Sequence, residues 1–382
     1  MKKVISLSIV VAILVTTLAG CTKTSTQTQT NEVKNFKVWV LAPLSGPGAN
    51  YGEDEINVFK LLVDKFNAEN SGKLHASLVV EDSKCNGKDG ASAAQKLISV
   101  DDVQVIVWEI CSVASIPAGK IAQANKIPMI APVSSAPDIS TIGNYVFRFR
   151  NDAAVTKKLS TYLTKQWAKN IFVLVENTDY GVGYGQWIKD SFSWNVIEEK
   201  FQSDEKDFDI LSKKILNAKD IDAVVFVVNS DGNTVSLIKS FDKNGVLKSF
   251  KWKLYGTEIT TSDWVVASLW NLLNDIKVTQ LVTIEELWQK AQKLTQEFES
   301  SFPIKWNMFY DVLLAEWLSL TLDAVKNVWY DADAIKNYFN SFNSSNQRDG
   351  YFGKYYFSPE RDAVGLNFVI YQVNNGELTA IE

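Results

Sequence analysis

Short apolar runs alternate with longer segments of helical character in the part of the chain that follows residue 34. The runs predict buried parallel strands, because strands covered on both faces are apolar almost throughout. They are Phe36–Leu41, Leu78–Val80, Val103–Val107 and Ile127–Ile130. Helices are expected between them, near Glu53–Asn70, Ala91–Ser99 and Ala114–Asn125. This order of elements predicts an α/β lobe with a parallel sheet.

A second series of the same kind begins after Arg150. Helices are expected at Ala153–Gln166, Tyr184–Lys200 and Thr234–Asp242, and strands at Ile171–Val175 and Ala223–Val228. Two successive βαβ series predict two Rossmann-like, doubly wound α/β lobes.

The C-terminal part is predicted to be mainly helical before a final strand at Asn367–Val373. One helix face carries apolar residues whose spacing favours core packing: Leu313, Trp317, Leu320 and Ala324. The chain has 382 residues, more than one hydrophobic core usually serves, so the length also favours two lobes.

The N-terminus has the pattern of an export signal. Lys2 and Lys3 precede an apolar run, Val4–Leu18, that is short for a membrane span. The run ends in Leu-Ala-Gly-Cys21, which resembles the lipobox of bacterial lipoproteins. The resemblance implies cleavage before Cys21 and lipid attachment to it; the alternative is an ordinary signal peptide with an incidental cysteine. Residues 1–20 are therefore predicted to be removed, and residues 21–33 to form a flexible tether outside the cytoplasm.

The charge balance argues against a nucleic-acid partner. The formal net charge is -5, and removal of Lys2 and Lys3 makes it -7. No basic cluster accompanies this mildly acidic balance, so nucleic-acid binding is not expected.

Two cysteines remain once Cys21 is set aside. Cys85 and Cys111 form an even pair in an oxidising compartment, which leaves a disulfide, two free thiols or a metal site as alternatives. A bridge would close a loop of about 26 residues and contribute roughly 3 kcal/mol. The only histidine, His75, lies in a strand-like run, so no metal site is expected.

Polar loops follow the predicted strands. In open α/β sheets, ligands bind beyond the carboxyl ends of the strands, where helix N-termini offer free amides. The loops at those ends are Ala42–Gly52, Glu109–Ser112, Ala131–Pro137, Glu176–Gly181, Asn229–Gly232 and Tyr255–Glu258. A single Ser or Tyr among them would be read as a turn or cap residue, whereas their joint placement favours a binding site. Both Cys85 and Cys111 fall at this edge, which predicts that they are bonded to each other.

Several separated motifs resemble one family. They are Pro-Leu-Ser-Gly-Pro47, the Cys85 and Cys111-Ser112 pair, Ile130-Ala-Pro132, Asp179-Tyr-Gly181 and Gly256-Thr-Glu258, in this order. Together they resemble the type I periplasmic binding proteins of the branched-chain amino-acid uptake group, over residues 34–382. The resemblance implies a Venus flytrap with three crossovers near residues 150, 282 and 355. Residues 34–150 and 282–355 would then form lobe 1, and residues 151–281 and 356–382 lobe 2.

The resemblance also implies a set of ligand-binding residues. Ser112 and Ser135 would bind a ligand carboxylate, the backbone around Ser134 would accept from the ammonium, and Glu258 would provide its negative counter-charge. Tyr51 and Tyr180 would line and close the pocket, and Asn229 stands where many relatives have an aromatic residue. The complete set is Tyr51, Ser112, Ser134, Ser135, Tyr180, Asn229 and Glu258. Glu258 has no partner nearby in the sequence, which favours an anchoring role.

The implied function is that of a monomeric substrate-binding lipoprotein that delivers a branched-chain or related amino acid to the permease of an ABC importer. The alternatives are an amide, urea-like or aromatic ligand, or the ligand-sensing module of a signalling system. An enzyme is not expected, because Ser112 has no histidine base near it and no Walker loop or nucleophile elbow is present. No cofactor is expected either.

The tryptophans are unusually numerous and oddly placed. There are 12 Trp and 19 Gly, and their sum, 31 of 382, is close to an ordinary glycine share of roughly 7%. Trp167, Trp194 and Trp329 follow predicted helices, where positive φ favours glycine. Trp39 and Trp108 stand in strands where the family has small residues or a tight turn. We hypothesise that many are natively Gly, encoded by a reassigned UGA codon; the alternative is a Trp-rich protein, which suits Trp317.

Overall fold

The computed structural model describes residues 32–46, 48–107, 109–281, 289–302 and 308–382. The predicted export signal, Cys21 and all but the last two residues of the 21–33 tether lie outside this range, as does Trp108. Within it, no helix combines the length and the apolar character that crossing a membrane requires.

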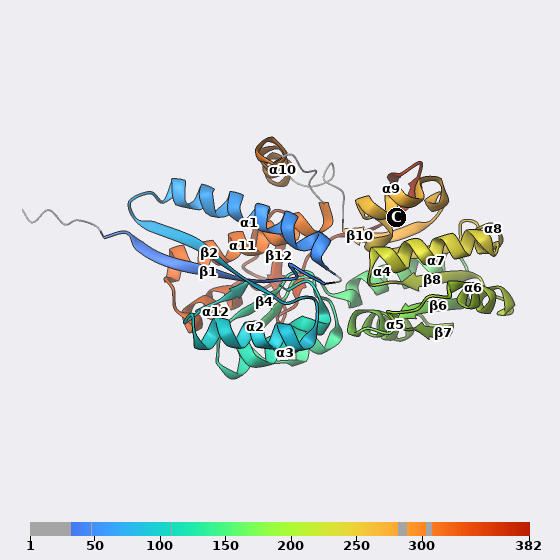
Figure 1. Ribbon diagram of the computed structural model, residues 1–382, viewed down its shortest axis with the longest axis horizontal. Coiled ribbons are helices and arrows are strands. Elements are labelled where there is room, and N and C mark those ends of the chain that lie inside the picture. The colour runs from blue at the N-terminus through green and yellow to red at the C-terminus, as the bar shows by residue number, and fades with distance from the viewer. Residues whose placement is uncertain (1–31, 47, 108, 282–288, 303–307) are drawn as a thin grey trace, which may run out of the picture. The chain divides into compact units, whose positions relative to one another are not determined.

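The first lobe is built on a five-stranded parallel sheet with the order β2-β1-β3-β4-β5 (Figure 1). Its strands are β1 (Lys34–Ala42), β2 (Leu74–Asp82), β3 (Ile106–Val107), β4 (Met129–Ala131) and β5 (Val146–Arg148). They are connected by α1 (Ala49–Glu69), α2 (Gly87–Ser99), α3 (Ser112–Ala124) and the 3₁₀ helix η1 (Pro137–Thr141).

The second lobe has a seven-stranded sheet with the order β15-β14-β10-β9-β8-β6-β7, in which β14 alone runs opposite to the other strands and so pairs antiparallel with both β10 and β15. Its strands are β6 (Asn170–Glu176), β7 (Asn195–Phe201), β8 (Ala223–Val227), β9 (Leu254–Thr257), β10 (Lys277–Leu281), β14 (Phe368–Asn374) and β15 (Glu377–Ala380). Its helices are α4 (Asp152–Lys165), α5 (Asp179–Ser191), α6 (Phe208–Asn217), α7 (Asp231–Lys243), α8 (Val246–Ser249), η2 (Glu258–Thr261), α9 (Asp263–Leu269) and η3 (Trp270–Leu273).

Between β10 and β14 the residues that the structure describes form three helices and a small sheet. These are α10 (Gln289–Ser301), α11 (Met308–Val328), α12 (Ala332–Asn340), β11 (Arg348–Gly350), β12 (Gly353–Phe357) and β13 (Ala363–Val364). Helix α11 packs on both α1 and α12. Trp317 of α11 is fully buried and stacks on Phe357 with ring centroids 5.5 Å apart, which confirms that this helix face packs in the core.

Both faces of the first sheet are covered, as the apolar runs predict. Along β1, Phe36, Val38 and Val40 belong to one buried cluster, whereas Trp39 and Leu41 belong to another. Because successive side chains of a strand point to opposite faces, this alternation shows that the strand separates two apolar layers.

The predicted fold class is confirmed, with one wrong helix. The run Tyr184–Lys200 was expected to be a single helix, but α5 ends at Ser191 and residues Asn195–Phe201 form β7. This strand pairs only with β6, at the edge of the sheet, where Glu199 is partly exposed and Lys200 is exposed. The sequence prediction also missed β5, β9, β10, β11, β12, β13 and β15.

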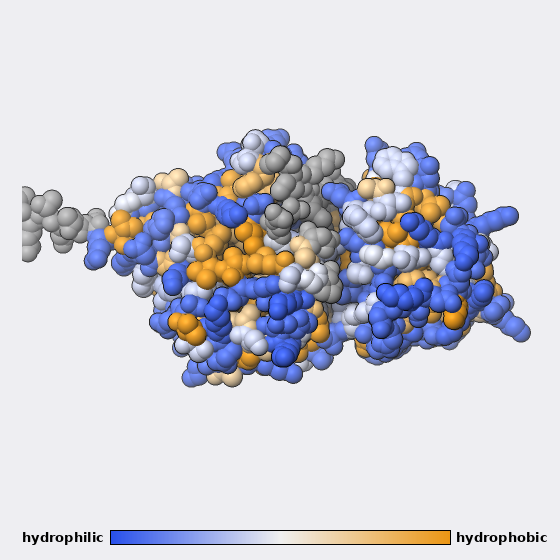
Figure 2. Space-filling model, in the orientation of Figure 1, coloured by the Kyte–Doolittle hydropathy of each residue, from blue (hydrophilic) through white to orange (hydrophobic). Residues whose placement is uncertain are grey.

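Tryptophans are prominent among the exposed apolar residues. Figure 2 shows a face on which hydrophobic residues lie among hydrophilic ones. Six described tryptophans are exposed over more than a third of their surface: Trp167, Trp194, Trp252, Trp264, Trp270 and Trp329. The expected positive φ is confirmed for Trp167 and Trp329, at 63° and 66°. It is wrong for Trp194, because α5 ends in extended backbone at Phe192, with φ -97°, and needs no left-handed residue there.

Candidate functional site

A small inner cavity of about 50 Å³ is lined by residues from both lobes. Six of the seven residues predicted to bind ligand line it: Tyr51, Ser112, Ser135, Tyr180, Asn229 and Glu258. The other lining residues are Gly48, Cys85, Ile110, Cys111, Val133, Arg150 and Ile259. The loops at the carboxyl ends of the strands therefore meet at one place, as the topology of such sheets requires.

One wall of the inner cavity carries hydrogen-bond donors without a formal charge. Ser112 is the first residue of α3, whose leading amides have no acceptor within the helix. The Ser112 hydroxyl accepts a hydrogen bond from the Ala136 amide at 3.3 Å, which fixes the helix start against the turn that carries Ser135. This wall is suited to a carboxylate.

Ser134 lies outside the lining of the inner cavity. Its buried hydroxyl donates to the Glu109 carbonyl oxygen at 2.6 Å and is 2.5 Å from the Ser115 hydroxyl. The side chain thus ties the turn after β4 to the start of α3. Ser134 is the one predicted residue that does not line the inner cavity, and its side chain stabilises this turn instead.

Glu258 has a partner that the sequence analysis missed. Arg150 donates from Nη1 to Oε1 of Glu258 at 2.7 Å and from Nη2 to Oε2 at 2.9 Å, and both side chains are buried. Glu258 indeed has no partner nearby in the sequence, but the fold brings Arg150 to it. Arg150 follows β5, a strand too short to be recognised from its apolar run, and is separated from Glu258 by 108 residues.

A second acid completes this charged cluster. Asp152 is fully buried at the start of α4, with Oδ1 3.3 Å from Nη2 of Arg150. Burial raises the pKa of Asp152 to about 6, although the charge of Arg150 opposes the rise. Near neutral pH the cluster of Arg150, Asp152 and Glu258 holds one positive and up to two negative charges.

Tyr180 brings a buried hydroxyl to the inner cavity. This hydroxyl makes no hydrogen bond to another described residue, and the centre of the Arg150 guanidinium lies 5.9 Å from the tyrosine ring. Burial raises the pKa of Tyr180, so the phenol stays neutral. A neutral, unpartnered hydroxyl is able to donate to a bound ligand.

Two buried contacts hold the edge loops in place. The Tyr51 hydroxyl donates to Oδ1 of Asp231, at the start of α7, at 2.8 Å. Arg148 donates from Nη1 to the carbonyl oxygens of Ser135 and Ala136 at 2.6 and 2.7 Å, and it forms a bidentate ion pair with Asp362. The turn that carries Ser135 is therefore fixed by a residue of the adjacent strand.

The predicted disulfide between Cys85 and Cys111 is confirmed, with Cα atoms 5.4 Å apart. Cys111 is the residue before α3, so the bridge fixes the position of Ser112 relative to the loop after β2. The alternatives of two free thiols or a metal site are thereby set aside. In the described residues no group of three or more potential metal ligands occurs, and His75 is exposed on β2.

We expect the double variant Cys85→Ser/Cys111→Ser to unfold with a free energy about 3 kcal/mol smaller than that of the parent chain, because the cross-link restricts the unfolded state. Urea denaturation of the double variant and of the parent chain with its disulfide intact measures the difference. A loss below about 0.5 kcal/mol would show that the bridge does not hold this loop. Ser71→Ala, in the exposed turn before β2, serves as a control for a small surface change.

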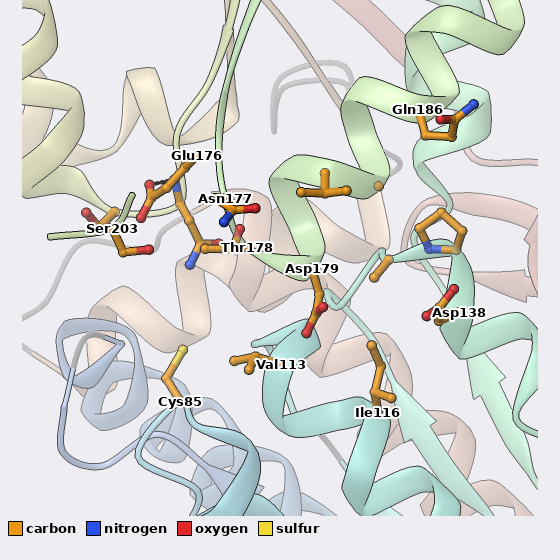
Figure 3. Close-up of a pocket in the computed structure, with 16 residues that line it drawn as sticks. Cys85, Val113, Ile116, Asp138, Glu176, Asn177, Thr178, Asp179, Gln186 and Ser203 are labelled. Atoms are coloured by element: carbon orange, nitrogen blue, oxygen red, sulfur yellow. Dashed lines mark hydrogen bonds between the residues drawn. The ribbon is translucent and has the colours of Figure 1, made fainter. Parts of the chain in front are cut away.

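A larger outer cavity, about 780 Å³ in volume, shares Cys85 and Asn229 with the inner one. Figure 3 shows Val113 and Ile116 of α3 facing Asn177, Thr178 and Asp179 across it. Buried Glu176, also in its lining, accepts from the Asn229 amide at 2.7 Å. The outer cavity thus adjoins the inner one and has a mixed polar and apolar lining.

These edge loops have counterparts in known proteins. The sequence pattern of a family described as periplasmic binding protein matches residues 36–377. The chain belongs to this family. Its members are solute-binding proteins and not enzymes, in agreement with the sequence prediction. Relatives named for leucine, isoleucine and valine support the resemblance to the branched-chain amino-acid group.

Three relatives illustrate the likeness. A Leu/Ile/Val-binding protein of Citrobacter freundii is 28% identical over 217 residues, which cover 55% of this chain and 58% of that protein. A branched-chain amino-acid transporter substrate-binding protein of Streptococcus pneumoniae, solved with isoleucine, is 22% identical with a TM-score of 0.80, covering 91% of this chain and 99% of that one. A solute-binding protein of R. palustris, solved with benzoate, is 20% identical with a TM-score of 0.77, covering 90% and 95%. The two structures show the shared Venus flytrap fold.

Proposed function

We propose that the chain is the extracytoplasmic substrate-binding component of an ABC importer and that it captures a branched-chain or related amino acid between the lobes, where the inner cavity adjoins the larger outer one. The convergence of Ser112, Ser135 and Glu258 on one cavity carries this proposal. An amino acid presents a carboxylate and an ammonium, and the cavity offers neutral donors on one wall and an acid on another. The relatives named for Leu, Ile and Val support this class of ligand.

The proposed contacts follow from the lining. The carboxylate would receive hydrogen bonds from the start of α3 and the hydroxyls of Ser112 and Ser135, and Glu258 would accept from the ammonium. Tyr51, Val133 and Ile259 would contact the ligand side chain. Each charge-assisted hydrogen bond contributes about 1.5–3 kcal/mol, so a few of them suffice for micromolar binding, about -8 kcal/mol.

Lipid attachment at Cys21, the lobe boundaries stated above, delivery to permease subunits and a monomeric state belong to the same proposal. A thermal-shift screen against the common amino acids tests the ligand-binding part of the proposal. A ligand present at 100 times its Kd adds about 2.7 kcal/mol to the free energy of unfolding. We expect a branched-chain amino acid to give the largest shift, and no shift with any amino acid would contradict the proposal.

An aromatic or other carboxylate is the second candidate class of ligand. It is favoured by one observation, the pairing of Glu258 with Arg150, because the arginine compensates the negative charge of Glu258 without a ligand ammonium. The R. palustris structure with benzoate shows that this fold is able to hold such a ligand. Addition of benzoate to the same screen separates the two classes.

We expect ligand to close the two lobes about the crossovers near residues 150, 282 and 355, since proteins of this architecture move by hinge rotation. Small-angle X-ray scattering with and without saturating ligand measures the change. The radius of gyration should fall when ligand is added. An unchanged profile at saturation would count against closure.

A further inference from the structure

We propose that Arg150 determines the selectivity of the inner cavity, so that carboxylates lacking an α-ammonium group are accepted almost as well as amino acids. The inference rests on the proposed function, since it concerns the same cavity. It adds a residue that the resemblance to the family did not supply.

The geometry of the ion pair supports this role. Each Glu258 oxygen already accepts from a separate Arg150 nitrogen, at 2.7 and 2.9 Å, and both residues line the cavity. Removing one member of a buried ion pair is costly, because the other is left uncompensated. A ligand without an ammonium leaves Glu258 compensated by Arg150, so the cavity has little means of rejecting it.

The experiment compares leucine with 4-methylpentanoate, which is leucine with hydrogen in place of the amino group. We expect the wild-type chain to bind the two with affinities that agree within about tenfold by calorimetry. In Arg150→Gln, Glu258 depends on the ligand ammonium, so the preference for leucine should widen to about 100-fold or more. Arg150→Gln/Glu258→Gln removes both charges and should return the preference to within about tenfold, which also guards against a misfolded single variant.

A wild-type preference for leucine above about 100-fold, unchanged in Arg150→Gln, would overturn the proposal. Binding of 4-methylpentanoate without leucine would support the role of Arg150 and overturn the amino-acid function. Binding of neither compound, with amino acids also failing in the thermal-shift screen, would overturn both.

A different observation supports a second proposal, on the tryptophans. We infer that the residues written as Trp at positions 167, 252, 270 and 329 are glycines in the protein that its source organism makes, because UGA is read there as glycine. All four have positive φ, with values of 63°, 70°, 31° and 66°. In this region the Cβ atom of an L-residue approaches the following carbonyl oxygen, and only glycine avoids the contact.

Two of these residues occupy recognised glycine positions at helix ends. After α4, the Trp167 amide donates to Thr164 O and the next amide donates to Leu163 O, both at 3.0 Å, which is the Schellman motif with Trp167 at C′. After α11, the Trp329 amide donates to Val325 O at 3.0 Å, which is the αL motif. Gly245 occupies the comparable position after α7, with φ 83°.

Exposure argues in the same direction. The relative exposures are 84% for Trp167, 53% for Trp252, 52% for Trp270 and 36% for Trp329. At the three positions that are more than half exposed, the indole gains too little burial to offset an unfavourable backbone conformation; Trp329 is more buried and packs edge-on against Phe36, so there the argument rests on its φ and its place at the helix end. Trp317 differs, because it is fully buried, and the inference does not extend to it.

Tandem mass spectrometry of the protein isolated from its source organism tests the inference at each position. We expect peptides with glycine at all four positions and UGA at the four codons; tryptophan in these peptides, or UGG codons, would overturn it. In the recombinant chain, Trp167→Gly and Trp329→Gly should each raise Tm by about 2–4 °C. Trp194→Gly, at an exposed site without positive φ, is the matched control and should not raise it.

Discussion

We expect Glu109→Gln to increase the free energy of unfolding by about 4 kcal/mol at pH 9 and by less than about 1 kcal/mol at pH 5. Glu109 is fully buried beside the start of α3, and one carboxylate oxygen accepts from the Cys111 amide at 2.8 Å. Burial raises the pKa of Glu109 from 4.5 to about 8, even though the Ser83 and Cys111 hydrogen bonds oppose the rise. Gln has the shape of the protonated acid and carries no charge.

The sign of the effect follows from the direction of the pKa shift. Between pH 4.5 and 8 the folded chain retains a proton on Glu109 that the unfolded chain has lost. The wild-type protein therefore loses stability as pH rises through this window, by about 1.4 kcal/mol per unit of pKa difference. Urea denaturation at pH 5 and pH 9 measures the effect. Glu69→Gln, on an exposed residue, is the control, and an equal response of both variants would contradict a buried, protonated Glu109.

We expect Asp362→Asn to reduce the free energy of unfolding by about 3–5 kcal/mol, because it leaves the Arg148 guanidinium buried without a counter-charge. Both side chains are at most one-tenth exposed, and the carboxylate accepts from Nε and Nη2 of Arg148 at 2.8 Å each. The same carboxylate accepts from Ser140 and Asn151. The loss should appear in thermal unfolding as well as in urea.

Glu360→Gln, two residues away and exposed, is the matched control for Asp362→Asn and should change the free energy of unfolding by less than about 0.5 kcal/mol. A similar small change in Asp362→Asn would mean that the ion pair does not hold the turn after β4. Ligand affinity should also fall in Asp362→Asn, since Arg148 fixes the carbonyl oxygens of Ser135 and Ala136.

The position of the site was predictable because it depends on topology. Buried parallel strands show as apolar runs, and the loops after them must meet at one sheet edge. Ser112 and Glu258 were found from their place in such loops and lie in one cavity. The cysteine pair was found in the same way, and its bond is present.

Arg150 was missed because β5 has only three residues, Val146–Arg148, and gives no clear apolar run. The signal was nevertheless in the sequence, as the alternation Phe147-Arg148-Phe149-Arg150. Alternate residues of an extended segment point to opposite sides, so Phe147 and Phe149 enter the core while both arginines point away from it. Two buried arginines require acidic partners. Asp152 lies two residues from Arg150, but the carboxylates that accept the hydrogen bonds of the two arginines, Asp362 and Glu258, are more than 100 residues away and depend on the tertiary fold.

The helix predicted over Tyr184–Lys200 was wrong in its second half, where local sequence preference is misleading. Residues Asn195–Phe201 are rich in Glu and Lys, which favour helix in isolation. They form β7 because the free edge of β6 provides a partner for their backbone, and an edge strand tolerates charged side chains. A tertiary contact therefore overrides the local preference here.

Calorimetric titration of Glu258→Gln beside the wild-type chain, with the amino acid that gives the largest thermal shift, tests the central claim most directly. In Glu258→Gln the Arg150 guanidinium stays buried without its counter-charge beside the ligand ammonium, so the variant should bind more weakly by about 2–4 kcal/mol, or roughly 30- to 1000-fold. Ser112→Ala should lose only about 1–2 kcal/mol, since the helix amides remain. Wild-type affinity in Glu258→Gln would contradict amino-acid capture at this cavity.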